Sequence, residues 1–112
     1  MQGSYLGPQY SQQEVEKKLN DLGAKFEILN EENLINRATE DLSKGNVIGW
    51  FQGRMEFGPR ALGCRSILGD ARSENMQKTL NLKVKFRESF RPFAPSVLRE
   101  DVSDWFELNC DS

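Results

Sequence analysis

The residues best suited to chemistry in this 112-residue chain lie in a Gly-rich stretch from Gly53 to Ser66. Its glycines permit positive φ angles and a close approach of the backbone to an oxyanion, and Pro59 stiffens the loop. Arg60 and Arg65 supply planar, permanently charged groups that match the geometry of phosphate. The stretch contains neither a GxxxxGK[ST] P-loop nor a Rossmann fingerprint. It therefore predicts a phosphate cradle of another kind.

A second cluster, residues 83–96, alternates cations with phenylalanines. Its spacing alone is compatible with three kinds of structure. The first is a half-buried strand with a solvated basic face. The second is a surface for single-stranded nucleic acid, on which the aromatic rings stack against bases. The third is a site for an anionic small molecule, since clustered cations favour an anionic partner.

The cations of this second cluster are expected to point in one direction. Lys85, Arg87 and Arg91 lie two and four residues apart, which places all three on one side of an extended segment. The predicted strand runs to about Arg91, with its aromatic side chains packed inward, and Pro92 ends it. We then expect the three cations to face the same cavity as the two arginines of the Gly-rich stretch.

The elements that must position these residues follow from apolar periodicity and capping signals. Ser11 and Glu14 form a capping-box pair, and Gly23 and Gly45 suit the ends of two helices. A short helical turn is expected at 60–63, and Asp101 is expected to cap a last turn that reaches residue 106. The remaining predictions are helices at 12–22, 32–43 and about 74–82, and strands at 25–29, a buried 46–51, and 65–68. This order indicates an α/β (α+β) domain.

Composition narrows the possible chemistry. The chain has no histidine, which argues against His-based acid, base or metal chemistry, and we expect no metal site. Residues 54–99 contain ten basic and four acidic side chains, between acidic flanks. Cys64 and Cys110 are expected to be unrelated reduced thiols. Without a signal peptide or a long apolar run, the expected location is the cytoplasm.

Two long motifs carry a family resemblance: GWFQGRMEFGPRALGCRSIL and KFRESFRPFAPSVL. The chain closely resembles the C-terminal domain of the nodulation-type and antibiotic-biosynthesis carbamoyltransferases. The resemblance implies a YrdC-like fold with a twisted mixed sheet, truncated at its C-terminus. It makes residues 1–112 a fragment of a longer, two-domain protein. Such a domain takes ATP and carbamoyl phosphate and forms a carbamoyl adenylate. A metal-dependent N-terminal domain of the same polypeptide then transfers the carbamoyl group to a hydroxyl acceptor.

The resemblance also implies roles for residues of the Gly-rich stretch. Arg60 and Arg65 match the arginines of the family's GPRALGxRS motif and are expected to hold phosphate groups. Ser66 matches its serine and is expected to donate a hydrogen bond to the same anion. Cys64 stands where an amide such as Asn is common in the family. The roles of Arg54 and Glu56 stay open: each is either an ion-paired or solvated group or a participant in the site.

Four residues of the second cluster match family positions as well. Lys85 and Arg87 match the basic pair of the KFRE element and are the expected catalytic residues. Arg91 and Ser96 match the arginine and serine of FRPFAPS and are expected to bind substrate. ATP is the expected co-substrate, and Mg²⁺ is a candidate ion for bridging its phosphates. The metal of the transfer domain is expected outside this chain.

The fragment alone is expected to be inactive in the complete transfer, and no membrane partner is expected. A nucleic-acid-binding module built on residues 83–96 is the alternative function. A pure scaffold for the partner domain is the third possibility.

Overall fold

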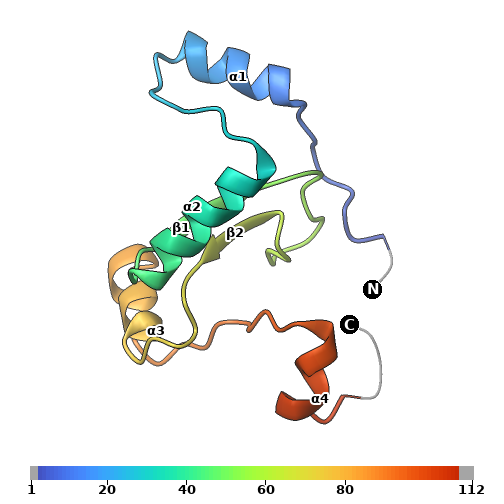
Figure 1. Ribbon diagram of the computed structural model, residues 1–112. Coiled ribbons are helices and arrows are strands. Elements are labelled where there is room, and N and C mark those ends of the chain that lie inside the picture. Colours follow the sequence, from blue (N-terminus) through green and yellow to red (C-terminus); the bar gives the residue numbers. More distant parts are fainter. Residues whose placement is uncertain (1–2, 109–112) are drawn as a thin grey trace. The chain divides into compact units, whose positions relative to one another are not determined.

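The computed structural model describes residues 3–108, which form two compact units, residues 3–70 and residues 71–108. Cys110 lies outside the described residues. The N-terminal unit contains, in chain order, α1 (Gln12–Asp21), α2 (Glu31–Ser43), β1 (Ile48–Phe51) and β2 (Arg65–Leu68) (Figure 1). The C-terminal unit contains α3 (Met76–Thr79), the π-helix η1 (Leu80–Val84), the 3-10 helix η2 (Arg99–Asp101) and α4 (Val102–Trp105). The expected mixture of helix and strand is confirmed.

The beginning of α1 follows the capping signal in the sequence. The Ser11 Oγ atom accepts a hydrogen bond from the Glu14 backbone N–H at 3.3 Å, and the Glu14 carboxylate accepts from the Ser11 backbone N–H at 2.8 Å. Gly23, at φ 65°, follows the helix in the left-handed region that glycine adopts easily. The predicted helix and its capping box are confirmed.

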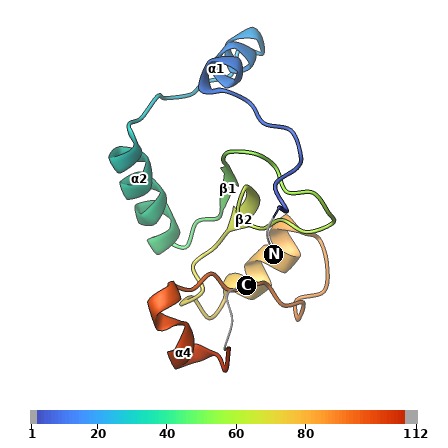
Figure 2. The same ribbon diagram turned by 90° about the vertical axis from the view of Figure 1, so that its right-hand side faces the viewer.

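The second helix is also confirmed, beginning one residue earlier than predicted. The Asn30 side chain caps α2 by accepting from the Asn33 backbone N–H at 2.9 Å. Both views show residues 22–30 as an extended connection between α1 and α2 (Figures 1 and 2). The strand predicted at 25–29 is wrong, since these residues form no strand. Alternation of apolar and polar residues within one segment does not produce a strand unless a second strand supplies partners for its backbone hydrogen bonds.

The strands β1 and β2 form an antiparallel pair, in which Ile48 lies opposite Leu68 and Phe51 opposite Arg65. The prediction that the first strand is buried is wrong, because Phe51 is 56% exposed. The described sheet has only these two strands, and none of their residues is fully buried. Residues 52–64, which we call the Gly-rich loop, connect the strand ends (Figure 2). The helical turn predicted at 60–63 is absent, since none of these residues is helical.

The segment of residues 4–8 is hydrogen-bonded to the first half of the Gly-rich loop through main-chain atoms. Gly7 N–H donates to the Met55 carbonyl at 2.9 Å, Met55 N–H to the Pro8 carbonyl at 3.0 Å, and Phe57 N–H to the Ser4 carbonyl at 2.7 Å. A Cβ atom at Gly7 would lie only 2.9 Å from the Cβ and carbonyl oxygen of Met55. This close approach therefore requires glycine at position 7.

The C-terminal unit begins with a helix that changes from α-helical to π-helical geometry. α3 continues directly into η1, and the Lys85 N–H donates to the Leu80 carbonyl at 2.9 Å, five residues back. The helix predicted at 74–82 is thus present, as residues 76–84, with a π-helical end that periodicity did not predict. Phe86 then reverses the chain at φ 50°, a backbone conformation unfavourable for an aromatic residue.

The strand predicted to run to Arg91 is wrong. No described residue between 86 and 91 is in a strand, and the Arg91 N–H donates back to the Glu88 carbonyl at 3.3 Å. The aromatic residues do not pack inward as predicted, since Phe86 is 86% exposed and Phe90 is 76% exposed. The physical reason is the left-handed turn at Phe86, which ends any extended run before it begins.

The last helical turn is confirmed as α4. Asp101 precedes it as predicted, but its side chain makes no capping hydrogen bond. The Asp101 N–H instead donates to the Leu98 carbonyl at 3.0 Å, which closes the preceding 3-10 turn.

Candidate anion-binding sites

Glu56 organises the second half of the Gly-rich loop. Its side chain is buried, and a single oxygen, Oε1, accepts hydrogen bonds from the backbone N–H groups of Leu62 at 2.7 Å and Cys64 at 2.6 Å. This arrangement answers the question that the sequence left open, because Glu56 is neither solvated nor paired with an arginine. It is a local anion around which the loop folds.

The same contacts lower the pKa of the Glu56 carboxyl. The Cys64 N–H is the largest cause, because it donates to the charged form, and the Leu62 N–H acts in the same direction against the opposing effect of burial. The folded state therefore binds a proton less readily than the unfolded chain does. The resulting stability is complete above the ordinary value of 4.5 and is lost as the pH falls through the folded pKa.

We expect a Glu56→Gln variant to lose this pH dependence in the loop. Glutamine keeps an acceptor oxygen but cannot ionise, so the Leu62 and Cys64 amide resonances should titrate below pH 4.5 in the parent chain and not in the variant. NMR from pH 7 to pH 3 measures this. Glu14→Gln is the matched control, because Ser11 lowers the Glu14 pKa outside the loop. Unchanged titration of the two amides in Glu56→Gln would contradict the assignment.

Arg65 holds the base of the loop. Its Nη1 atom donates to the carbonyls of Gln52 and Cys64, both at 2.8 Å, and its Nη2 atom donates to Gly53 at 3.2 Å and Pro8 at 3.4 Å. The guanidinium also lies 3.5 Å from the Phe51 ring centroid. Four of its five N–H groups thus have backbone partners. Phosphate binding by Arg65 stays a prediction, but the structure gives this guanidinium a loop-supporting role.

Arg60 is differently placed. It is exposed, and no described residue forms a hydrogen bond or ion pair with it. It borders an open pocket of about 180 Å³, whose lining also includes Met55, Glu56 and Arg65. A guanidinium with all its donors available beside a pre-ordered loop suits an anionic ligand. Among the predicted phosphate ligands of this loop, Arg60 is therefore the best placed.

Ser66 and Arg54 both have partners within the N-terminal unit. The Ser66 Oγ atom accepts from the Gly63 N–H at 3.0 Å, which closes the loop where β2 begins. Its donation to an anion stays a prediction. Arg54 donates to the Gly7 carbonyl at 3.0 Å, so it attaches residues 4–8 to the loop.

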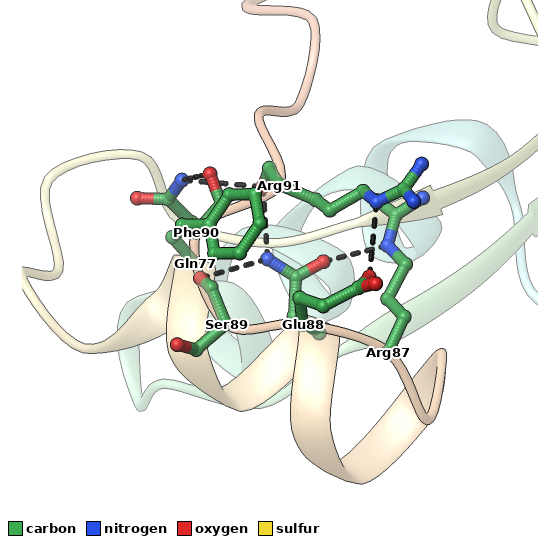
Figure 3. Close-up of polar contacts among 7 residues, drawn as sticks. Gln77, Arg87, Glu88, Ser89, Phe90 and Arg91 are labelled. Atoms are coloured by element: carbon green, nitrogen blue, oxygen red, sulfur yellow. Dashed lines mark hydrogen bonds and ion pairs between the residues drawn. The ribbon is translucent and has the colours of Figure 1, made fainter.

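In the C-terminal unit, Asn81 is the centre of a polar network that the sequence prediction missed. Figure 3 labels the residues that surround it. Asn81 is fully buried, at 0% exposure. Its Nδ2 atom donates to the carbonyls of Ser89 at 3.0 Å and Arg91 at 2.8 Å. Its Oδ1 atom accepts from Arg87 Nε at 2.7 Å, and its backbone carbonyl accepts from the Arg87 N–H at 2.9 Å. One side chain therefore fixes the turn that carries two of the predicted site arginines.

Arg87 and Arg91 have further contacts. The Arg87 guanidinium lies 4.9 Å from the Phe93 ring centroid, while Arg91 Nε donates to the Glu88 carboxylate at 3.0 Å. Gln77 Nε2 supports the turn by donating to the carbonyls of Phe90 and Arg91, both at 3.2 Å.

Lys85 and Ser96 are exposed, and no described residue forms a hydrogen bond or ion pair with either side chain. Their catalytic and binding roles stay predictions, as does a cavity shared by the two arginine clusters. Arg87 and Arg91 both contact Asn81, so the turn that Asn81 fixes brings them together, and not the predicted strand. The only sequence signal for this network is the position of Asn81, a polar amide residue among the apolar residues Leu80, Leu82 and Val84.

Both arginine clusters lie within one stretch of family similarity. A family model described as Carbamoyltransferase C-terminus matches residues 39–112. The chain belongs to the carbamoyltransferase C-terminal family. The resemblance seen in the two motifs to a carbamoyltransferase C-terminal domain is thereby confirmed.

Curated relatives of this carbamoyltransferase domain are much longer than the chain. It is 56% identical over 111 residues to the uncharacterized protein sll1178 of Synechocystis sp., covering 97% of the chain and 18% of that protein. It is 50% identical over 109 residues to nodulation protein NolNO of Sinorhizobium fredii, covering 96% and 16%. It is 49% identical over 65 residues to 3'-hydroxymethylcephem-O-carbamoyltransferase of Streptomyces clavuligerus, covering 58% and 12%. The chain thus spans less than a fifth of each relative.

Within residues 3–108, no helix is both long and apolar enough to cross a membrane. No three His, Cys, Asp or Glu side chains come together there in a group that could hold a metal ion. The described residues thus provide no ready-made Mg²⁺ cage, and Mg²⁺ stays a prediction, as does the cytoplasmic location.

Proposed function

We propose that this domain is the carbamoyl-activating part of an ATP-dependent O-carbamoyltransferase. It binds ATP and carbamoyl phosphate and forms a carbamoyl adenylate, which a separate N-terminal domain uses to carbamoylate a hydroxyl acceptor. The single observation that carries the proposal is Arg60, an exposed guanidinium without a described partner, beside a pocket of a loop already ordered by Glu56.

The chemistry of the proposed step requires cations rather than a side-chain nucleophile. Carbamoyl phosphate releases inorganic phosphate on reaction with water and leaves carbamate. A carbamate oxygen then bonds to the α-phosphorus of ATP, the bond between the α- and β-phosphates breaks, and pyrophosphate departs with the bonding electron pair. Negative charge grows on the departing group, and fixed guanidinium groups stabilise it.

The loop suits this task because its order does not depend on the ligand. Glu56 and Arg65 fix the backbone from the inside through carboxylate and guanidinium contacts to main-chain groups. Arg60 therefore does not have to build the loop as well as bind the anion. A site prepared in this way loses less conformational entropy when the anion binds.

Carbamoyl phosphate-dependent exchange of labelled pyrophosphate into ATP tests the proposal. We expect exchange when the chain is combined with its transfer domain, and no acceptor carbamoylation by the 112-residue chain alone. Robust carbamoylation by the chain alone would overturn the division between activation and transfer. Failure to bind ATP, with or without the transfer domain, would refute the activating role.

A competition arm of the same experiment separates the alternative function. The exposed rings of Phe86 and Phe90 beside basic residues are the observation that favours nucleic acid. A nucleic-acid module would bind a single-stranded oligonucleotide with a steep salt dependence and release it poorly to ATP. An activating site would bind ATP and be competed by pyrophosphate.

A further inference from the structure

The turn of residues 86–91 pairs one carboxylate with an arginine and sets a second arginine beside this pair. Glu88 Oε2 lies 3.0 Å from Arg91 Nε, and the more distant charge of Arg87 acts on the Glu88 carboxyl more weakly. In Figure 3 the Arg91 side chain meets the Glu88 carboxylate, while Arg87 Nε is bonded to the Asn81 side chain instead. An arginine paired with a carboxylate next to a second fixed arginine resembles an arrangement by which arginines hold a phosphoryl group.

The contacts of the two arginines use their Nε atoms and backbone groups, so the N–H groups of their Nη atoms stay available. Arg87 uses Nε for the Asn81 contact and rests on the Phe93 ring. Arg91 is fixed through its backbone carbonyl, which accepts from Asn81 at 2.8 Å and Gln77 at 3.2 Å. Among the described residues, no contact is made by the Nη atoms of either arginine to a carboxylate, amide or carbonyl oxygen.

The backbone of this turn is strained at one residue. Phe86 adopts φ 50° while its ring is 86% exposed, so burial of the ring does not explain the unfavourable conformation. The turn it forms sets the Arg87 N–H against the Asn81 carbonyl. Strain of this kind collects at ligand clamps, where the surrounding contacts enforce it.

We propose that Arg87 and Arg91, positioned by Asn81, form a phosphate clamp, and that Glu88 occupies the Arg91 side of this clamp until a phosphoryl group of the substrate displaces it. The inference rests on the proposed function, which supplies the phosphorylated ligands. The Glu88 and Arg91 side chains are each 54% exposed, and a pair so exposed contributes little net free energy. A phosphoryl dianion with several oxygens replaces it with stronger, bidentate contacts.

The occupant of the clamp controls which anions enter it. A carboxylate ligand carries the same charge as Glu88 and gains little by exchanging with it. A phosphoryl group carries more charge and an additional acceptor oxygen. Glu88 thereby disfavours carboxylate metabolites and leaves the site open to ATP, carbamoyl phosphate or pyrophosphate.

The test compares Glu88→Gln with the parent in the full chain, with inorganic pyrophosphate as the probe in isothermal titration at constant ionic strength. We expect the variant to bind about 2- to 5-fold more tightly, the range that exposed ion pairs allow. Glu74→Gln is the matched control, because it removes the same charge from an exposed glutamate of the same unit. Its affinity should equal that of the parent. Acetate should bind the Glu88→Gln variant detectably better than it binds the parent.

The outcomes separate this inference from the proposed function. Equal affinities of the parent and Glu88→Gln, with binding lost in Arg87→Ala and Arg91→Ala, would overturn the role of Glu88 and leave the function standing. Weaker binding by Glu88→Gln would show that Glu88 orients Arg91, which also overturns the inference. No loss in either arginine variant would refute the clamp itself. Parallel titrations with ATP and carbamoyl phosphate show which of these ligands gains affinity when Glu88 is replaced.

Discussion

Replacing Asn81 with alanine is expected to destabilise the C-terminal unit by on the order of 3 kcal/mol. The substitution removes the two hydrogen bonds that the Asn81 amide donates to the carbonyls of Ser89 and Arg91, and it removes the acceptor of Arg87 Nε. Because Asn81 is completely buried, water does not replace these partners without rearrangement of the turn. Chemical unfolding of the full chain measures the loss.

Hydrogen exchange at the Arg87 amide locates this effect. That N–H donates to the Asn81 backbone carbonyl, so it should exchange faster when the turn loosens. Asn81→Asp should be intermediate, because it keeps the oxygen that Arg87 contacts and loses the amide donor. Asn75→Ala is the control, since Asn75 is exposed and its side chain makes no capping bond. Equal effects of Asn81→Ala and Asn75→Ala would contradict the central position of Asn81.

Arg60→Ala is expected to weaken ATP or pyrophosphate binding by about 1.5–3 kcal/mol, or roughly 10- to 100-fold, without changing stability. Arg60 has no described protein partner to lose, so its removal affects the ligand alone. Isothermal titration measures the affinity, and thermal unfolding checks the fold. An unchanged affinity would show that the pocket beside Arg60 is not the anion site.

Arg65→Ala should behave in the opposite way. Its guanidinium binds the carbonyls of Gln52, Gly53 and Cys64, so the variant should lower the unfolding temperature and disorder the Gly-rich loop. Any loss of affinity would then follow from the disordered loop. Arg65→Lys should recover little, because an ammonium group lacks the planar fork that reaches several carbonyls at once.

Features that depend on neighbours along the chain could be predicted from the sequence. Ser11 and Glu14 lie three residues apart, and their mutual capping follows from local rules, as does the left-handed conformation of Gly23. The arginine-rich motifs and their family were equally accessible, because long motifs of fixed spacing are specific. The two strands at the ends of the Gly-rich loop were also predicted, but their pairing was not, and the predicted burial of the first strand was wrong.

The features that escaped prediction depend on contacts between distant residues. Asn81 reaches carbonyls eight and ten residues ahead, and it does so because Phe86 adopts a conformation that its residue type disfavours. Glu56 likewise meets backbone donors six and eight residues away, across a loop whose path no local rule gives. The alternation of cations with aromatic residues predicted a strand that runs to about Arg91. The structure has no strand there, because the chain turns at Phe86.

The attachment of residues 4–8 to the Gly-rich loop extends this domain beyond the residues that the family model matches. Residues 4, 7 and 8 contribute carbonyl oxygens, and Gly7 also contributes its N–H group. At Gly7 the side chain is constrained as well, because Met55 leaves no room for a Cβ atom. The family match begins only at residue 39. A domain cut at that residue would therefore lose both backbone partners of Met55, a residue that lines the Arg60 pocket.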